Sequence, residues 1–211
     1  FLIAAGPFVG SFIATLAIRW PAGSSILTGR SACRSCTAQL AWFDLIPVLS
    51  WIARRGRCGS CAAPIGPFYP LTELAALGIG IWAASQFGGQ DLLLACLLGW
   101  TLLALAAIDL RTMMLPDILT VPVLVLGLFV AGTDGRLAES LIGAALGFGV
   151  FALIATMYRR WRGHDGLGLG DAKLLGAAGA WVGWAGLPSI VLIASLAALV
   201  VAMPMALRVA G

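Results

Sequence analysis

Two aspartates, Asp109 and Asp171, adjoin apolar runs, where a carboxylate is costly unless it is hydrated or paired. Asp171 ends a stretch that contains Gly166, Gly168 and Gly170, and it begins an apolar helix. Asp109 closes another apolar run, at the helix end where the macrodipole disfavours an anion. Two neighbouring carboxylates share a proton, so one can activate water as a general base while the other protonates a carbonyl. The pair predicts aspartic protease chemistry, with both acids as catalytic residues.

The glycines before Asp171 fit such a site. Side chains at positions 168 and 170 would hold an extended peptide away from the acids, so Gly168 and Gly170 predict a substrate-approach loop. By itself, a Gly-x-Gly-Asp stretch is also typical of a flexible loop that ends in an aspartate N-cap. The presence of Asp109 and of a cysteine-rich insertion favours the catalytic interpretation.

Four of the five cysteines form two CxxC pairs, separated by the 21 residues from 37 to 57. This spacing is close to that of four-cysteine zinc sites, and it predicts a structural zinc ion. A polar insertion of this size has too little core to order itself, and a tetrahedral metal supplies folding energy. Disulfides and a redox dithiol are the alternatives. The predicted ligands are Cys33, Cys36, Cys58 and Cys61.

The positions of three other polar residues predict their roles less specifically. Glu73 lies near the start of an expected helix, where it either caps the helix dipole or serves as a candidate cofactor-binding residue. Asp117 follows a proline at another expected helix start, so a structural role suffices. His164 is the only histidine, and its polar loop favours an incidental role.

The composition indicates how these residues are positioned. The chain of 211 residues is 61% hydrophobic and 10% charged, and its mean hydropathy is +1.00. Soluble domains carry roughly 25% charged residues, so we expect an all-α integral membrane protein built as a polytopic helical bundle. Seven apolar runs predict about seven transmembrane helices, at residues 1–18, 70–87, 92–108, 115–131, 140–158, 174–187 and 189–207.

The basic residues predict the orientation. If the first span exits into the cytoplasm, every one of the 13 Lys and Arg residues except Arg136 lies on the cytoplasmic side. The polar insertion is then cytoplasmic, which favours zinc over disulfides. We expect three parts: a first transmembrane helix at 1–18, a cytoplasmic zinc-type domain at 19–69, and a transmembrane aspartic peptidase domain at 70–211.

Several motifs together resemble the type IV prepilin peptidases, the leader peptidases/N-methyltransferases, over nearly the whole chain. The matching stretches are Gly10-Ser-Phe, the two CxxC pairs, Ile46-Pro-Val-Leu-Ser50, Arg55-Gly-Arg-Cys58, Tyr69-Pro-Leu-Thr-Glu73, Asp109, Leu115-Pro-Asp117 and Gly168-Leu-Gly-Asp171-Ala-Lys. Two departures are Asp44-Leu45, where the family often has Asn before its Ile-Pro motif, and Arg34-Ser35 in place of a common proline. Many members also continue into a further helix beyond the position of Gly211.

The resemblance implies an intramembrane aspartic peptidase of the bacterial inner membrane. It would cleave the leaders of type IV prepilins and pseudopilins after glycine, on the cytoplasmic side, with Asp109 and Asp171 as catalytic acids. It also implies N-methylation of the new N-terminus with S-adenosylmethionine, an activity linked to the cysteine-containing domain. The expected partners are prepilin precursors and the lipid bilayer, with no nucleic acid.

Two other classes of function remain compatible with the residues. In a zinc-stabilised membrane transporter, Asp109 and Asp171 would form a proton or ion relay, because intramembrane acids commonly serve that role. In a purely structural assembly factor, neither acid would be needed for chemistry. Processing of a prepilin distinguishes the peptidase from both.

Overall fold

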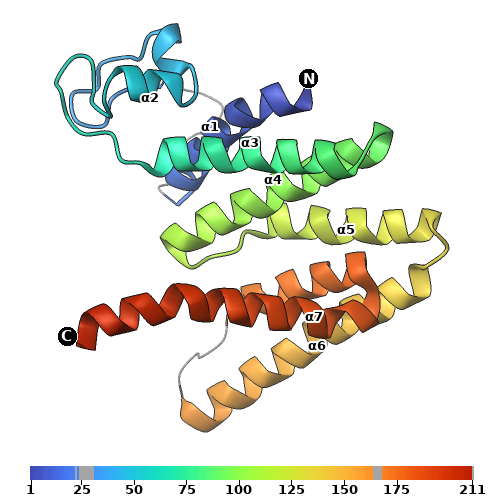
Figure 1. Cartoon of the computed structure of the whole chain (residues 1–211). Coiled ribbons are helices and arrows are strands. Elements are labelled where there is room, and N and C mark those ends of the chain that lie inside the picture. The colour runs from blue at the N-terminus through green and yellow to red at the C-terminus, as the bar shows by residue number, and fades with distance from the viewer. Residues whose placement is uncertain (22, 24–30, 164–167, 211) are drawn as a thin grey trace. The chain divides into compact units, whose positions relative to one another are not determined.

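The computed structural model describes residues 1–21, 23, 31–163 and 168–210. His164 and Gly166 therefore lie outside the described residues. The chain forms two compact units, Phe1–Met114 and Leu115–Gly211. Both are helical, and the described residues hold no β-strand beyond two isolated bridges (Figure 1).

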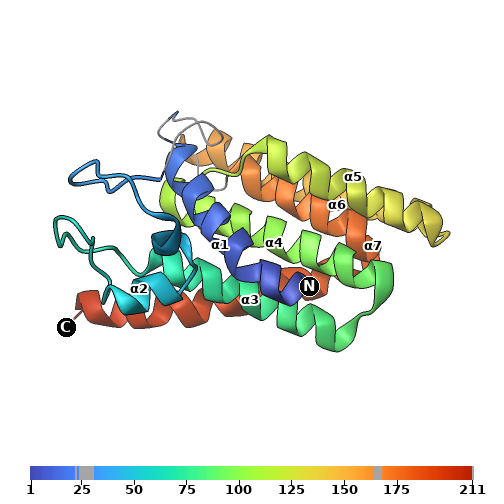
Figure 2. The same ribbon diagram turned by 90° about the horizontal axis from the view of Figure 1, so that it is seen from above.

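The first unit consists of three long helices and the cysteine-rich insertion. Its elements are α1 (Leu2–Arg19), η1 (Trp42–Leu45), α2 (Leu49–Ala53), α3 (Phe68–Gln86) and α4 (Gly89–Thr112). Helix α1 packs against both α3 and α4, and those two pack against each other. The insertion lies at the end of this unit where α1 stops and α3 starts (Figures 1 and 2).

Close backbone contact joins α1 to α3. A Cβ atom built on Gly10 would lie 2.5 Å from Glu73 Cα, and one built on Gly6 would lie 2.9 Å from the Ala76 carbonyl oxygen. Small residues at such positions let membrane helices approach closely. The indole N–H of Trp100 donates to the same Ala76 carbonyl at 3.0 Å, which adds α4 to the contact.

The second unit contains α5 (Asp117–Thr133), α6 (Leu137–Arg162) and α7 (Leu169–Ala210). Helix α7 packs against α5 and most extensively against α6. A Cβ on Gly143 of α6 would lie 2.5 Å from the Gly179 carbonyl oxygen, and one on Gly147 would lie 2.5 Å from that of Leu175. The Gly/Ala-rich part of α7 therefore packs tightly on its neighbour.

Helix α7 is interrupted at Gly183, whose φ of 71° and ψ of 178° are not helical. Glycine reaches a positive φ without strain, so the chain can change direction at this residue (Figures 1 and 2). The predicted boundary between the last two spans, at residues 187 to 189, is therefore wrong. Counting α7 as two parts, the helices α1, α3, α4, α5, α6 and α7 correspond to the seven predicted spans.

Within the described ranges, four helices are long and apolar enough to cross a membrane by length and composition. They are Leu2–Arg19, Gly89–Thr112, Leu137–Arg162 and Leu169–Val200. Asp117–Thr133 is a shorter apolar helix. The chain is a helical membrane protein, as its composition predicts.

Candidate metal centre and acidic site

The two CxxC pairs form matching loops in the insertion. In each loop the N–H of the first cysteine donates to the carbonyl five residues later, at 2.9 Å in both cases. Cys33 Sγ accepts the Ser35 N–H and Cys58 Sγ accepts the Ser60 N–H, again both at 3.4 Å. The shared sequence Cys-x-Ser-Cys-x-Ala could have revealed this local repeat. Each loop therefore presents two sulfurs in the same way.

The four sulfur atoms have the spacing of a tetrahedral metal site. All four Sγ atoms lie within 4.8 Å of one another, and those of Cys33 and Cys61 are 3.8 Å apart. A tetrahedron with zinc–sulfur bonds of about 2.3 Å has edges of about 3.8 Å. All five cysteines of the chain are described and are free thiols rather than disulfides. This cluster can bind a metal ion such as zinc.

The thiols of this cluster have divergent acidities. The backbone N–H groups of Cys36 and Ser35 stabilise the Cys33 thiolate and lower its pKa to about 6. The Ala63 N–H favours the Cys61 thiolate, but the Cys36 sulfur, burial and the other cysteines outweigh it and raise the pKa of Cys61 to about 12. Crowded thiolates repel one another, so the cluster retains protons that a bound cation would displace.

Glu73 is held inside the first unit. Helix α3 begins at Phe68, so Glu73 falls after its first turn, and the predicted dipole-capping role is wrong. Its side chain is only 5% exposed. The Val48 N–H donates to Glu73 Oε2 at 2.7 Å, and the Ser11 hydroxyl also bonds to this carboxylate. Glu73 therefore connects α3 both to α1 and to the residue before α2.

A cavity of about 570 Å³ lies beside Glu73 in the first unit. Its walls come from α1, both cysteine loops, α2, the start of α3 and the end of α4, and include Ser11, Cys33, Trp51, Cys58, Glu73 and Arg111. The sequence did not predict it, because its walls come from segments far apart in the chain. Its size is typical of small-molecule sites.

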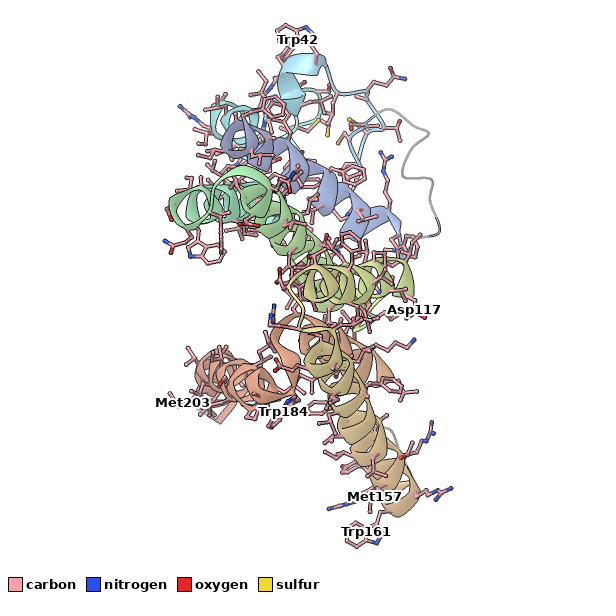
Figure 3. All side chains as sticks on the ribbon, turned by 90° about the vertical axis from the view of Figure 1, so that its right-hand side faces the viewer. Trp42, Asp117, Met157, Trp161, Trp184 and Met203 are labelled. Carbon is pink, nitrogen blue, oxygen red and sulfur yellow. The ribbon has the colours of Figure 1, made fainter. Side chains whose placement is uncertain are left out.

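The segment between the cysteine loops divides into an inward and an outward part. Trp51 donates its indole N–H to the Ile65 carbonyl at 3.0 Å. Asp44, one of the departures from the family pattern, pairs with Arg54 at 2.8 Å. Trp42 instead points outward and is 78% exposed (Figure 3). This exposure favours contact of Trp42 with the membrane interface, where tryptophan is enriched.

Asp109 lies in the last turn of α4, close to where the sequence predicts a helix end. The helix stops at Thr112 because Met113 adopts a left-handed conformation, and the Met113 N–H donates to the Asp109 carbonyl at 2.8 Å. The guanidinium of Arg111 lies 4.9 Å from the centre of the Phe68 ring. Arg111 is thus stacked on an aromatic ring of its own unit.

Asp171 lies in the first turn of α7, and its N–H donates to the Gly168 carbonyl at 3.1 Å. A Cβ on Gly168 would lie 3.5 Å from Asp171 Oδ2. A Cβ on Gly170 would lie 3.2 Å from the Leu115 Cβ atom. Gly168 therefore leaves space beside the carboxylate, whereas Gly170 allows α7 to pack against the chain before α5.

An ion pair next to Asp171 was not anticipated from the sequence. Lys173 Nζ donates to both carboxylate oxygens of Asp117, at 2.7 and 2.9 Å. The pair joins the start of α7 to the start of α5 (Asp117 is labelled in Figure 3). Asp117 thus has a partner in addition to its favourable place at a helix N-terminus. Lys173 and Asp117 each belong to a motif of the family pattern, and this was the only hint in the sequence that the two residues form a pair.

Two family models match this chain. The family model described as the bacterial peptidase A24 N-terminal domain matches residues 4–87, and that of the type IV leader peptidase family matches residues 96–203. No solved structure matches the chain.

Similar curated proteins carry the name prepilin leader peptidase/N-methyltransferase. One from Burkholderia pseudomallei (strain 1026b) is 45% identical over 84% of this chain and 58% of its own length. One from Aeromonas hydrophila is 41% identical over 82% and 60%, and one from Klebsiella pneumoniae is 39% identical over 94% and 91%. The chain thus spans about three fifths of the first two relatives and nearly all of the third. It belongs to the type IV leader peptidase family.

Proposed function

We propose that this protein is an intramembrane aspartic endopeptidase that removes the leaders of type IV prepilins and pseudopilins after glycine. The observation that carries the proposal is the family match over residues 96–203, which includes both Asp109 and Asp171. Each acid lies in a terminal turn of a helix, rather than in the middle of an apolar span. The relatives' names supply the substrate class.

In the proposed reaction, Asp109 and Asp171 act as a pair. One carboxylate takes a proton from water, and the other donates a proton to the carbonyl oxygen of the peptide bond. Gly168 has no side chain to contact the Asp171 carboxylate, and this supports the approach of an extended peptide. Gly170 has a packing role against Leu115 as well as the proposed role in substrate approach.

We place the enzyme in the bacterial inner membrane, with its active site and cysteine-rich insertion on the cytoplasmic side. The distribution of basic residues supports this orientation, because only Arg136 falls on the opposite side. Four helices suited to crossing a membrane support a multi-pass protein. The lipid bilayer then surrounds its apolar helices.

We further propose a structural zinc ion held by Cys33, Cys36, Cys58 and Cys61. The sulfur spacing and the paired loops support it. Bound zinc would stabilise the fold of an insertion whose described helices are only four and five residues long. The name of the relatives also supports N-methylation of the new N-terminus, for which S-adenosylmethionine supplies the methyl group.

The proposal is tested by co-expressing a prepilin with the wild type, Asp109→Asn or Asp171→Asn, and following the prepilin's size and N-terminal mass. Loss of a catalytic acid is expected to slow cleavage by about 10² to 10⁴-fold. Asp91→Asn, in the first turn of α4, and Asp134→Asn, after α5, are matched controls that should cleave normally.

Continued cleavage by either variant at position 109 or 171 would contradict the proposed pair. An ionophore that collapses the membrane gradient separates the peptidase from a transporter. Cleavage should persist without a gradient, whereas ion-dependent flux with no prepilin processing would favour the ion-relay alternative.

A further inference from the structure

Glu73 is an acid for which the peptidase reaction has no use. Its carboxylate is 5% exposed and lines the cavity of the first unit. Within the described part of the chain, its hydrogen bonds come from neutral donors, the Val48 N–H and the Ser11 hydroxyl. A buried carboxylate without a cationic partner is costly, and a cationic group placed next to it reduces that cost. The geometry therefore suits a ligand that brings a positive charge.

The other walls of the cavity provide complementary groups. Arg111 lines the cavity. Its guanidinium lies 4.9 Å from the centre of the Phe68 ring, and this contact holds the positive charge of Arg111 at the cavity wall. A guanidinium binds a carboxylate well. Trp51 and Tyr69 add aromatic surface. The walls also include a second acid and four further arginines, namely Asp44, Arg19, Arg34, Arg54 and Arg57. The cavity thus offers negative groups, positive groups and aromatic faces to one small molecule.

We propose that this cavity binds S-adenosylmethionine, with Glu73 beside the sulfonium group and Arg111 beside the amino-acid carboxylate. The inference rests on the proposed N-methyltransferase activity and assigns it a place in the chain. The cavity volume of about 570 Å³ falls within the range of roughly 300 to 1,000 Å³ found for small-molecule sites. The ligand's sulfonium, carboxylate and adenine match the three kinds of group in the walls.

The proposed transfer balances without any further reactant. A bond forms between the lone pair of the substrate's N-terminal nitrogen and the methyl carbon, while the sulfur–carbon bond breaks and leaves its electron pair on sulfur. The nitrogen then loses one proton to water. The positive charge beside Glu73 disappears in this step, so the product S-adenosylhomocysteine should bind less tightly than the donor.

The position of the cavity also gives the metal cluster a role in this activity. Cys33 and Cys58, one from each cysteine loop, line the cavity. A zinc ion that fixes the two loops would therefore fix one wall of the binding site. This contact explains physically why a structural metal and methyl transfer would depend on each other.

The test measures binding rather than turnover. Purified full-length protein is titrated with S-adenosylmethionine and, separately, with S-adenosylhomocysteine by calorimetry. We expect the wild type to prefer the charged donor by about tenfold or more, and Glu73→Gln to reduce that ratio towards one. Glu73→Asp, which keeps the charge, should restore most of it. Arg111→Gln should weaken both ligands by a similar factor, and Glu139→Gln in α6 is the matched control.

Zinc content reports whether each variant keeps its insertion folded. An unchanged donor-to-product ratio in zinc-loaded Glu73→Gln would overturn the site, and so would wild-type affinity for both ligands in Arg111→Gln. These results differ from failure of the proposed function itself. If the wild type cleaves a prepilin but never adds a methyl group to it, the methyltransferase proposal fails.

Discussion

At the scale of single residues, Lys173 has a contact that can position the proposed catalytic acid Asp171. It lies two residues after Asp171, and it donates hydrogen bonds of 2.7 and 2.9 Å to the two oxygens of Asp117. These partners are 56 residues apart in the chain. The pair therefore fixes the first turn of α7 relative to the start of α5, and Asp171 belongs to that turn.

We predict that Lys173→Met lowers the kcat of prepilin cleavage by about fivefold with little change in KM, because an exposed ion pair contributes up to about 1 kcal/mol. Asp117→Asn should have a similar effect. The double variant should be no worse than either single one, since both remove the same interaction. Steady-state kinetics in detergent or proteoliposomes provide the measurement.

Lys173→Arg is the conservative control and should retain most of the activity. Strictly additive losses in the double variant would show that the ion pair does not position Asp171. A loss confined to KM would instead indicate a role in binding the precursor.

At the scale of elements, helices α6 and α7 depend on glycines that face each other. A Cβ on Gly143 would lie 2.5 Å from the carbonyl oxygen of Gly179, which is backbone and cannot move aside independently. On the same helix α6, a Cβ on Gly149 would meet nothing within 4 Å. An alanine at position 143 therefore affects both helix packing and helix propensity, whereas an alanine at position 149 affects helix propensity alone.

We predict that Gly143→Ala destabilises the protein by about 1 to 3 kcal/mol, because the added methyl group forces the two helices apart. Gly149→Ala should be neutral or stabilising by up to about 1 kcal/mol, since alanine favours a helix more than glycine does. Thermal unfolding in detergent, followed by far-ultraviolet circular dichroism, compares the two. Equal melting temperatures for both variants would contradict the close packing of α6 and α7.

At the scale of the molecule, the proposed chemistry draws on both units. Asp109 and the cysteine cluster belong to Phe1–Met114, and Asp171 belongs to Leu115–Gly211. The family models divide differently, with one over residues 4–87 and the other over 96–203. The second of these includes both proposed catalytic acids and excludes the four cysteines of the cluster. Methyl transfer and proteolysis should therefore be separable.

We predict that Cys33→Ser loses its zinc and the methylation of the mature N-terminus, while prepilin cleavage changes by about twofold or less. Metal analysis and the mass of the mature N-terminus measure the two effects. Cys96→Ala, at a buried cysteine of α4 far from the cluster in sequence, is the control and should retain zinc and methylation. A zinc-free variant that still methylates would refute the dependence.

Much of the helical fold could be predicted from the sequence, because a membrane-spanning helix is a continuous run of apolar residues and can be recognised locally. Runs of apolar residues predicted the helices, whereas the orientation inferred from the basic residues stays a prediction. The CxxC spacing predicted the cysteine cluster, since two residues between cysteines already bring their sulfurs close. Asp109 was identified because the dipole disfavours an acid at its helix end, and Asp171 because it follows a glycine-rich stretch.

The tertiary structure decided what depends on contacts between distant segments. The break in α7 falls at Gly183 rather than at residues 187 to 189, which hydropathy could not show because the residues on both sides are apolar. The bond from Val48 to Glu73 spans 25 residues, and the ion pair of Lys173 spans 56. The cavity needs walls from three long helices and the insertion. Packing brings these groups together, so no local pattern of residues could have placed them.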